Sequence, residues 1–278
     1  MHRLALCLLA CWPAALAPGQ ERPGSRDERR WIETFVPRLE TPAAQLAHAR
    51  RLKRNLEGAQ PEERTFWRKL AVEAYQAVRL FHGDGAAAAE ASFRAGELLR
   101  AGGEEERALS EFQNAELLGT GTEFRSRARL EIGHLHRKNA RPREALDAYL
   151  RVTADAAGES FRRDDAWYWA GVVWRAEEQL DDARSAWRRV AEHGIDPLDR
   201  VLAFDALALS YLELGDLEAA AGVLNECLTA LSERALEETS EGERVRNALL
   251  RMRVVDELQR AIARKNHSSE EPRTSRNP

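Results

Sequence analysis

Residues 200–228 read RVLAFDALALSYLELGDLEAAAGVLNECL, and their apolar pattern is the clearest indication of the fold. Apolar residues recur at three- and four-residue spacing on both sides of Leu214-Gly215-Asp216. This spacing predicts two amphipathic helices that are joined by a tight turn. A single hairpin of this kind leaves part of its apolar surface exposed, so further elements of the chain must cover that surface.

The same pattern occurs four times, with a period of 37 or 38 residues. Small residues, which we call the repeat anchors, occupy the equivalent position in each segment: Gly96, Gly133, Gly171 and Ala208. Twelve residues after each anchor stands an alanine, and four residues later stands a large apolar residue: Phe112, Tyr149, Trp187 and Leu224. Seven residues after the first and last anchors, Gly103 and Gly215 mark the turn between two helices.

Packing explains the pattern. Small residues on both helices allow close approach of the backbones, and the bulky residues fill the space beside the contact. The chain is rich in Ala, Leu, Glu and Arg and shows no convincing alternation of apolar and polar residues, so we expect an all-α fold. Stacked hairpins then bury the faces that each hairpin leaves open.

These residues resemble the tetratricopeptide repeat, whose pattern is W-x2-L-G-x2-Y, then A-x3-F, then P. The best match is Trp167-x2-Ala170-Gly171-x2-Trp174, followed by Ala183-x3-Trp187 and Pro197. The repeats around Gly96 and Gly133 depart from the pattern at Ser92, Arg129 and His136. The resemblance implies a right-handed superhelical solenoid of antiparallel helix pairs. The usual period is about 34 residues, and the longer period here is similar to the repeats of bacterial envelope proteins.

Composition and breakers divide the chain into six parts. We expect a signal peptide in 1–19, a leader in 20–40 that is flexible as far as Arg30 and then forms a short helix, and a degenerate helical repeat in 41–88, which begins at the capping pair Thr41-Pro42. Four repeats follow in 89–240. One long amphipathic helix, Glu243 to Arg264, is expected to cap the solenoid within 241–264, or alternatively to mediate dimerisation. The polar tail 265–278 is expected to be disordered.

The first 19 residues predict export, because Arg3 precedes a short apolar run and small residues stand before Gln20. Cleavage near Gln20 predicts a periplasmic or envelope-associated protein. The run Leu8-Leu9-Ala10-Cys11 alternatively resembles a lipobox, which would make Cys11 a lipid anchor. In either case no apolar run is long enough to span a membrane. After cleavage near Gln20 only Cys227 remains, so no internal disulfide is expected.

The first helix of each hairpin lines the concave side of such a solenoid, according to the resemblance. Four residues after the anchors stand Arg100, Arg137, Arg175 and then Leu212. Three guanidinium groups in neighbouring hairpins predict a ladder that suits an acidic protein or peptide partner, although an arginine-rich chain also places arginine on solvated surfaces. Phe93 and Tyr168 are expected to offer apolar contacts in the same groove.

Other function classes have little support in the sequence. The net charge is -4, which does not favour nucleic acid as a partner. His134 and His136 point to different sides of a helix, so we expect no metal, and motifs for a cofactor or a catalytic site are absent. We therefore predict a non-catalytic exported scaffold that binds protein or peptide in its groove. Glu159-Ser160 resembles a pair found in lytic transglycosylases, so a helical enzyme or accessory protein of cell-wall metabolism is one alternative, and a self-assembling envelope protein is another.

Overall fold

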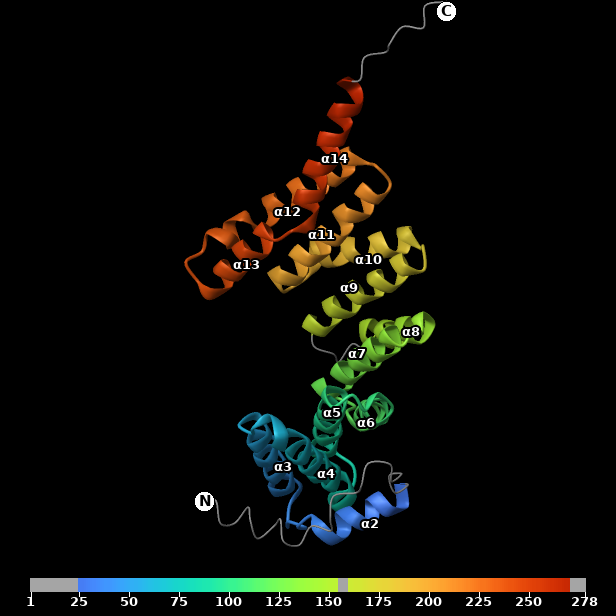
Figure 1. The fold of residues 1–278 in the computed structure, drawn as a ribbon, viewed down its shortest axis with the longest axis vertical. Coiled ribbons are helices and arrows are strands. Elements are labelled where there is room, and N and C mark those ends of the chain that lie inside the picture. The colour runs from blue at the N-terminus through green and yellow to red at the C-terminus, as the bar shows by residue number, and fades with distance from the viewer. Residues whose placement is uncertain (1–24, 155–159, 271–278) are drawn as a thin grey trace, which may run out of the picture.

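The computed structural model describes residues 25–154 and 160–270, and all regular secondary structure in these residues is helical. The expected signal peptide, Cys11 and Glu159 lie outside the described residues. None of the described helices is long and apolar enough to cross a membrane. The elements, labelled in Figure 1, are α2 (Ser25–Phe35), α3 (Pro42–Glu57), the short 3-10 helix η1 (Pro61–Glu63), α4 (Arg64–His82), α5 (Ala86–Ala101), α6 (Glu105–Leu118), α7 (Glu123–Lys138), α8 (Pro142–Ala154), α9 (Ser160–Ala176), α10 (Leu180–His193), α11 (Pro197–Glu213), α12 (Leu217–Leu236), α13 (Ser240–Leu250) and α14 (Arg253–Glu270).

Helices α5 to α12 form the four predicted hairpins, stacked in chain order along an elongated molecule (Figure 1). The first helices α5, α7, α9 and α11 begin 37 residues apart, at Ala86, Glu123, Ser160 and Pro197. Each helix of the array packs against the helix before it and the helix after it. The prediction of an all-α helical-repeat fold is thus confirmed.

The repeat anchors lie where the two helices of a hairpin approach most closely. A Cβ atom added to Gly96 would lie 2.7 Å from the Phe112 ring, and one added to Gly133 would lie 2.4 Å from the Tyr149 ring. At Gly171 the corresponding distance to Trp187 is 2.5 Å. These contacts are too short for any side chain, so glycine at the anchor and the aromatic ring sixteen residues later form one packing unit, as the sequence pattern predicted.

The turn between the helices has the same backbone in all four hairpins. Seven residues after the anchor the backbone is left-handed, with φ of 79° at Gly103, 53° at Ala140, 62° at Glu178 and 75° at Gly215. The next amide N–H donates to the carbonyl oxygen five residues earlier, for example from Gln179 to Trp174 at 2.8 Å. This is the Schellman arrangement, which favours glycine at the left-handed position. Two of the four turns adopt it without glycine.

The N-terminal end of the array is more ordered than the sequence predicted. Helix α2 begins at Ser25, so the expectation of a flexible leader as far as Arg30 is wrong. The helix packs on α4, where Ile32 is buried and Glu28 forms an ion pair with Arg107 of α6. The predicted start of the next helix is confirmed, because the Thr41 hydroxyl accepts a hydrogen bond from the Ala44 amide at 3.1 Å. Helix α2 thus covers apolar surface of α4 that would otherwise be exposed.

The C-terminal end also departs from the prediction. The expected single helix from Glu243 to Arg264 is broken at Arg251 and Met252 into α13 and α14, and α14 continues to Glu270, so residues 265–270 are helical. Met252 is 4% exposed and its sulfur lies 4.0 Å from the sulfur of the buried Cys227. The break places Met252 in the core and turns α14 back onto α11 and α12. No glycine or proline marks this break in the sequence.

Candidate functional site: the groove face of the first helices

The three predicted ladder arginines lie on successive first helices, and each reaches the first helix of the next hairpin. Nη1 of Arg100 lies 2.8 Å from a carboxylate oxygen of Glu131 on α7. Nε of Arg175 donates to Glu213 on α11 at 3.2 Å. The guanidinium of Arg137 lies over the Trp169 ring on α9, 4.5 Å from its centroid. The arginines therefore tie neighbouring hairpins together as well as presenting charge.

These contacts change what the arginine row can bind. Arg100 and Arg175 are each matched by a carboxylate, which lowers the net positive charge available to a ligand. Both side chains remain more than 40% exposed, so a ligand can still reach them. Arg137 is exposed and stacks on an aromatic face instead of pairing with a carboxylate in that contact. The edge of a stacked guanidinium donates hydrogen bonds to oxygen atoms; Arg137 uses part of this edge for the Tyr149 hydroxyl, and its side chain remains exposed to a ligand.

An open pocket of about 600 Å³ lies over α5, α7 and α9. Three cationic side chains and one indole are among the residues that line it. The full lining is Arg100, Ala101, His134, Leu135, Arg137, Lys138 and Trp169. Lys138 also forms an ion pair with Glu105 of α6. Positive charge beside an aromatic surface suits a peptide that combines a carboxylate with an apolar side chain.

His134 is a structural part of this pocket. Burial, together with the nearby Arg137 and Arg100, lowers the pKa of His134 to about 4, so the ring is neutral at neutral pH. Its Nδ1 lies 2.8 Å from the Tyr149 hydroxyl, and its ring meets the Trp169 ring edge to face at 5.1 Å. Among the described residues no cluster of three or more His, Cys, Asp or Glu side chains is arranged to hold a metal ion.

The two predicted aromatic groove residues have different positions. Phe93 is only 2% exposed and packs against the Phe112 and Phe124 rings, so it belongs to the core. The guanidinium of Arg127 covers it from outside, 4.6 Å from the ring centroid. Tyr168 is half-buried, and its ring lies edge to face with Trp169 at 5.4 Å. The expectation that Phe93 is open to a peptide is therefore wrong, because α7 and Arg127 cover its ring.

The structure groups the predicted residues into two places. Arg100 and Arg137 share the pocket over α5, α7 and α9, whereas Arg175 and Leu212 line a second gap near α14. Sequence reasoning missed Trp169 and Lys138, which complete the first pocket. They stand two residues before the Gly171 anchor and five residues after the Gly133 anchor. Neither position belongs to the repeat consensus, and only the arrangement of three helices brings them together.

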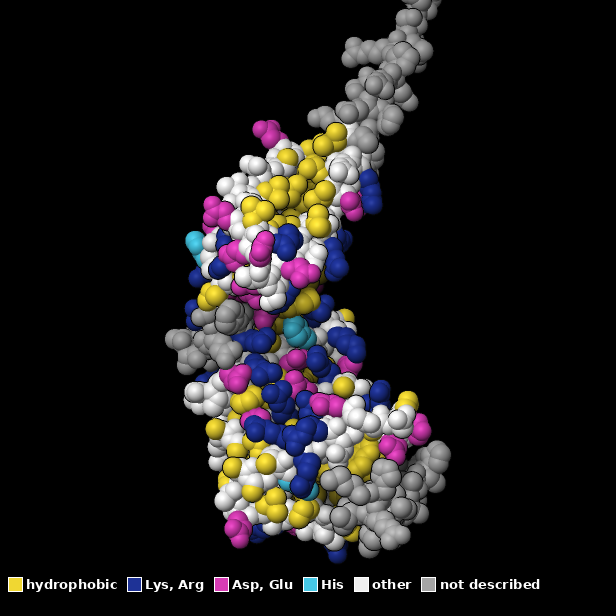
Figure 2. All heavy atoms as spheres, turned by 90° about the vertical axis from the view of Figure 1, so that its left-hand side faces the viewer, with side chains coloured by type: hydrophobic (Ala, Val, Ile, Leu, Met, Phe, Trp, Pro, Cys, Tyr) yellow, Lys and Arg dark blue, Asp and Glu magenta, His cyan; other side chains and the backbone are white. Residues whose placement is uncertain are grey.

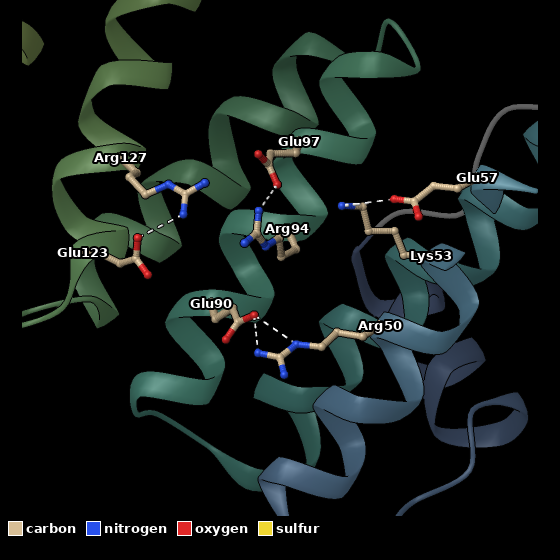
Figure 3. A network of polar contacts seen from close by, with 8 residues as sticks. All are labelled: Arg50, Lys53, Glu57, Glu90, Arg94, Glu97, Glu123 and Arg127. Atoms are coloured by element: carbon tan, nitrogen blue, oxygen red, sulfur yellow. Dashed lines mark hydrogen bonds and ion pairs between the residues drawn. The ribbon is translucent and has the colours of Figure 1, made fainter. Parts of the chain in front are cut away.

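Towards the N-terminus the face becomes a network of paired charges (Figure 3). Arg50 of α3 donates to Glu90 of α5 at 2.6 Å, and on α5 Arg94 donates to Glu97 at 2.8 Å. On one face of the molecule, Lys and Arg side chains gather over the middle and lower parts, whereas hydrophobic side chains gather near the C-terminal end (Figure 2). Because its charges are mutually matched, the N-terminal network offers less net attraction to a charged ligand than the pocket does.

Solved structures of helical-repeat proteins are similar to this chain. MamA has 20% sequence identity, a TM-score of 0.50, and an alignment that covers 63% of this chain and 96% of MamA. A putative kinesin light chain from Podosopora anserina with nearly identical TPR-like repeats has 15% identity, a TM-score of 0.54 and coverages of 72% and 100%. MamA from Desulfovibrio magneticus RS-1 has 18% identity, a TM-score of 0.51 and coverages of 70% and 98%.

The sequence itself matches no protein-family model and no curated protein, so the similarity is one of structure. The similarity to these solved structures covers 63–72% of the chain, and a helical-repeat fold agrees with the anchors, the aromatic partners and the shared turns. Sequence identities of 15–20% establish the architecture of the chain rather than its partner. The chain has the superhelical fold of tetratricopeptide-repeat proteins.

Proposed function

We propose that this chain is a non-catalytic scaffold that binds a peptide or an extended protein segment on the groove face of its first helices. The observation that carries the proposal is the open pocket in which Arg100, Arg137 and Lys138 surround Trp169. The cations suit a carboxylate, such as an acidic side chain or a C-terminus, and the indole suits an adjacent apolar group. The partner is thus expected to be acidic with apolar residues beside the charge.

The structure favours an extended segment over a small metabolite. The pocket is open, and its lining comes from the three successive first helices α5, α7 and α9. A small-molecule site is expected to enclose most of its ligand. A segment lying across several hairpins can instead gain modest contacts at each repeat, as concave solenoid surfaces allow.

We also propose that the scaffold is exported and acts in the periplasm or at the cell envelope, on the basis of the signal-like residues 1–19. The mass of the mature N-terminus, measured on protein recovered from cell fractions, distinguishes the two forms of this proposal. A start at Gln20 supports cleavage of a plain signal peptide, whereas an acylated Cys11 supports a lipoprotein. An intact N-terminus in the cytoplasmic fraction contradicts both.

The binding proposal is tested by quantitative capture of partners from an envelope extract with full-length protein. Arg137→Glu and Trp169→Ala each change one wall of the pocket, and the matched control is Arg143→Glu, which makes the same charge change at an exposed site on α8 of the same hairpin. We expect partners that are recovered with wild type and R143E to be reduced at least tenfold with both pocket variants. Equal recovery with all four proteins would remove the pocket from the account. Cell-wall turnover activity and self-assembly through the C-terminal helix stay alternative predictions.

A further inference from the structure

The C-terminal helix α14 occupies one end of the groove face. It begins at Arg253, three residues after the last residue of α13, and then packs against α11 and α12 (Figure 1). Leu209 and Leu212 of α11, which stand one and four residues after the anchor Ala208, line a gap of about 220 Å³ beside it. These are groove positions, so α14 borders the groove face of the fourth hairpin.

The contacts of α14 are those of a docked amphipathic helix. Its residues Arg253, Glu257 and Ala261, each one turn apart, line the gap opposite α11. Val254 is fully buried in the same core cluster as Phe204 and Leu207 of α11, and Val255 packs against that cluster. Together with the half-buried Leu258, four residues after Val254, these side chains form one apolar stripe of the helix. The fourth hairpin therefore holds a helix by its apolar face.

A carboxylate of the groove also caps this helix. The Val254 amide donates to Oδ1 of Asp205 on α11 at 2.8 Å. Asp205 stands three residues before the anchor, at the position that Phe93 and Tyr168 occupy in other repeats. An aspartate that accepts from a free amide in the first turn is the usual capping interaction, but here it comes from another helix. Asp205 thus recognises the N-terminus of a helix in a defined orientation.

Past its first turns, α14 exposes side chains to solvent. Gln259 and Arg260 are exposed, and Ile262 is 45% exposed. On the groove side, Arg175 and Glu213 on one wall face Arg253 and Glu257 on the other, so each wall carries both charges. A helix that is held by one apolar stripe and capped from another helix can be exchanged, provided that the competing helix overcomes the advantage of the tether.

From this arrangement we propose that the groove face of α9 and α11 is a binding site for an amphipathic helix, and that α14 is its built-in occupant. A partner helix with apolar residues spaced as in Val254, Val255 and Leu258 replaces α14 and places its N-terminus on Asp205. This proposal rests on the proposed function, because it assigns the helical part of the partner to the end of the groove that follows the basic pocket. It also makes α14 an intramolecular competitor of that partner.

The test uses the full-length chain and a fluorescent synthetic peptide of residues 251–270. Val255→Asp places a charge on the docked stripe and is expected to release α14, whereas the matched control Gln259→Asp places the same charge on the exposed side. Because a tethered helix competes at an effective concentration in the millimolar range, wild type and Q259D should bind the peptide at least tenfold more weakly than V255D. Equal binding by all three proteins would overturn the proposal.

A second pair of measurements locates the site and guards against misfolding. Adding Leu212→Glu to V255D should weaken peptide binding at least tenfold, and adding Asp205→Asn should weaken it roughly fivefold through loss of the charged cap. In a variant that carries both Leu212→Cys and Ala261→Cys, a bismaleimide cross-link between the two introduced thiols should abolish peptide binding, because both positions line the same gap. Undiminished binding by the L212E variant or by the cross-linked chain places the peptide elsewhere and refutes the site.

The outcome is independent of the test of the basic pocket. The peptide experiment probes α11 and α14, whereas capture with R137E and W169A probes α7 and α9. Peptide exchange with unchanged partner capture supports the helix site and removes the basic pocket. Loss of capture without peptide exchange supports the pocket and removes the helix site.

Discussion

The two turns that lack glycine at their left-handed position are predicted to be the most easily stabilised sites in the repeats. In the turn after α9, Glu178 has φ of 62°, and in the turn after α7, Ala140 has φ of 53°. The equivalent residues of the other two hairpins are Gly103 and Gly215, at 79° and 75°. A Cβ added to either of these glycines would meet no atom within 4 Å, so the preference for glycine comes from the backbone alone.

The magnitude follows from two opposing effects. A non-glycine residue in the left-handed region costs about 1–2 kcal/mol. Replacing it by glycine removes that cost but increases the freedom of the unfolded chain, which offsets about 0.4–1 kcal/mol. We therefore expect Glu178→Gly to raise the free energy of unfolding by about 0.5–1 kcal/mol, and Ala140→Gly to do the same. The two changes lie in different hairpins, so their effects should nearly add.

Urea unfolding followed by circular dichroism measures the effect, with peptide-amide hydrogen exchange to localise it to the α9–α10 hairpin. The matched control is Glu177→Gly, at the neighbouring exposed position, which does not have positive φ. Glycine there gains nothing from the backbone and should lower stability by roughly 0.5–1 kcal/mol. The reasoning is refuted if E178G is no more stable than wild type, or if E177G and E178G change stability in the same direction.

Three further predictions concern packing within the hairpins, the pH dependence of stability and the N-terminal end of the array. Gly133→Ala should destabilise the fold by about 1–3 kcal/mol, because its Cβ would lie 2.4 Å from Tyr149. Gly222→Ala, in open space on α12, should instead stabilise the fold by roughly 0.5–1 kcal/mol. Urea unfolding compares the two variants. Burial raises the pKa of Asp199 to about 7, helped by Asp165, Asp196 and Asp164 and opposed by Arg162. The folded state therefore holds this proton more tightly than the unfolded chain, and stability is lost as pH rises from about 4 through 7. Asp199→Asn should flatten this part of the pH profile and stabilise the protein at pH 8 by about 1 kcal/mol after solvent screening. Unfolding curves at several pH values measure this effect. An unchanged pH profile contradicts the burial of this carboxyl. Ile32→Asp should destabilise the N-terminal hairpin and expose α4 to hydrogen exchange, because Ile32 is 4% exposed beneath α2, whereas the same change at the exposed Thr34 should not.

The repeats could be predicted from the sequence because one physical unit recurs in them. The anchor and the bulky residue sixteen positions later must fit against each other in each hairpin, as Gly133 and Tyr149 do in the second. This requirement leaves a fixed spacing in the sequence. The same is not true of the turns. Ala140 and Glu178 adopt the backbone of Gly103 and Gly215 because the flanking helices impose it, and no residue type announces that conformation.

The ends and the site were harder to predict, because they depend on contacts between distant segments. Helix α2 is held by Ile32 against α4, and α14 is held by a cap from Asp205, 49 residues before Val254. Neither contact recurs at a fixed spacing in the sequence. The arginine positions were predicted from the repeat, but Trp169, which stacks under Arg137, stands outside the consensus. Sequence alone thus placed charge on the groove face without showing which charges are already matched.

The central claim is that a partner lies on the groove face of the first helices, at the pocket built around Trp169. Photo-cross-linking in cells tests it most directly, with a photoreactive phenylalanine derivative placed at Trp169 in one full-length protein and at the exposed Arg143 of α8 in another. We expect a discrete adduct of higher mass from position 169, which is lost when Arg137→Glu is added, and no such adduct from position 143. An adduct that forms equally from both positions, or only from position 143, would contradict it.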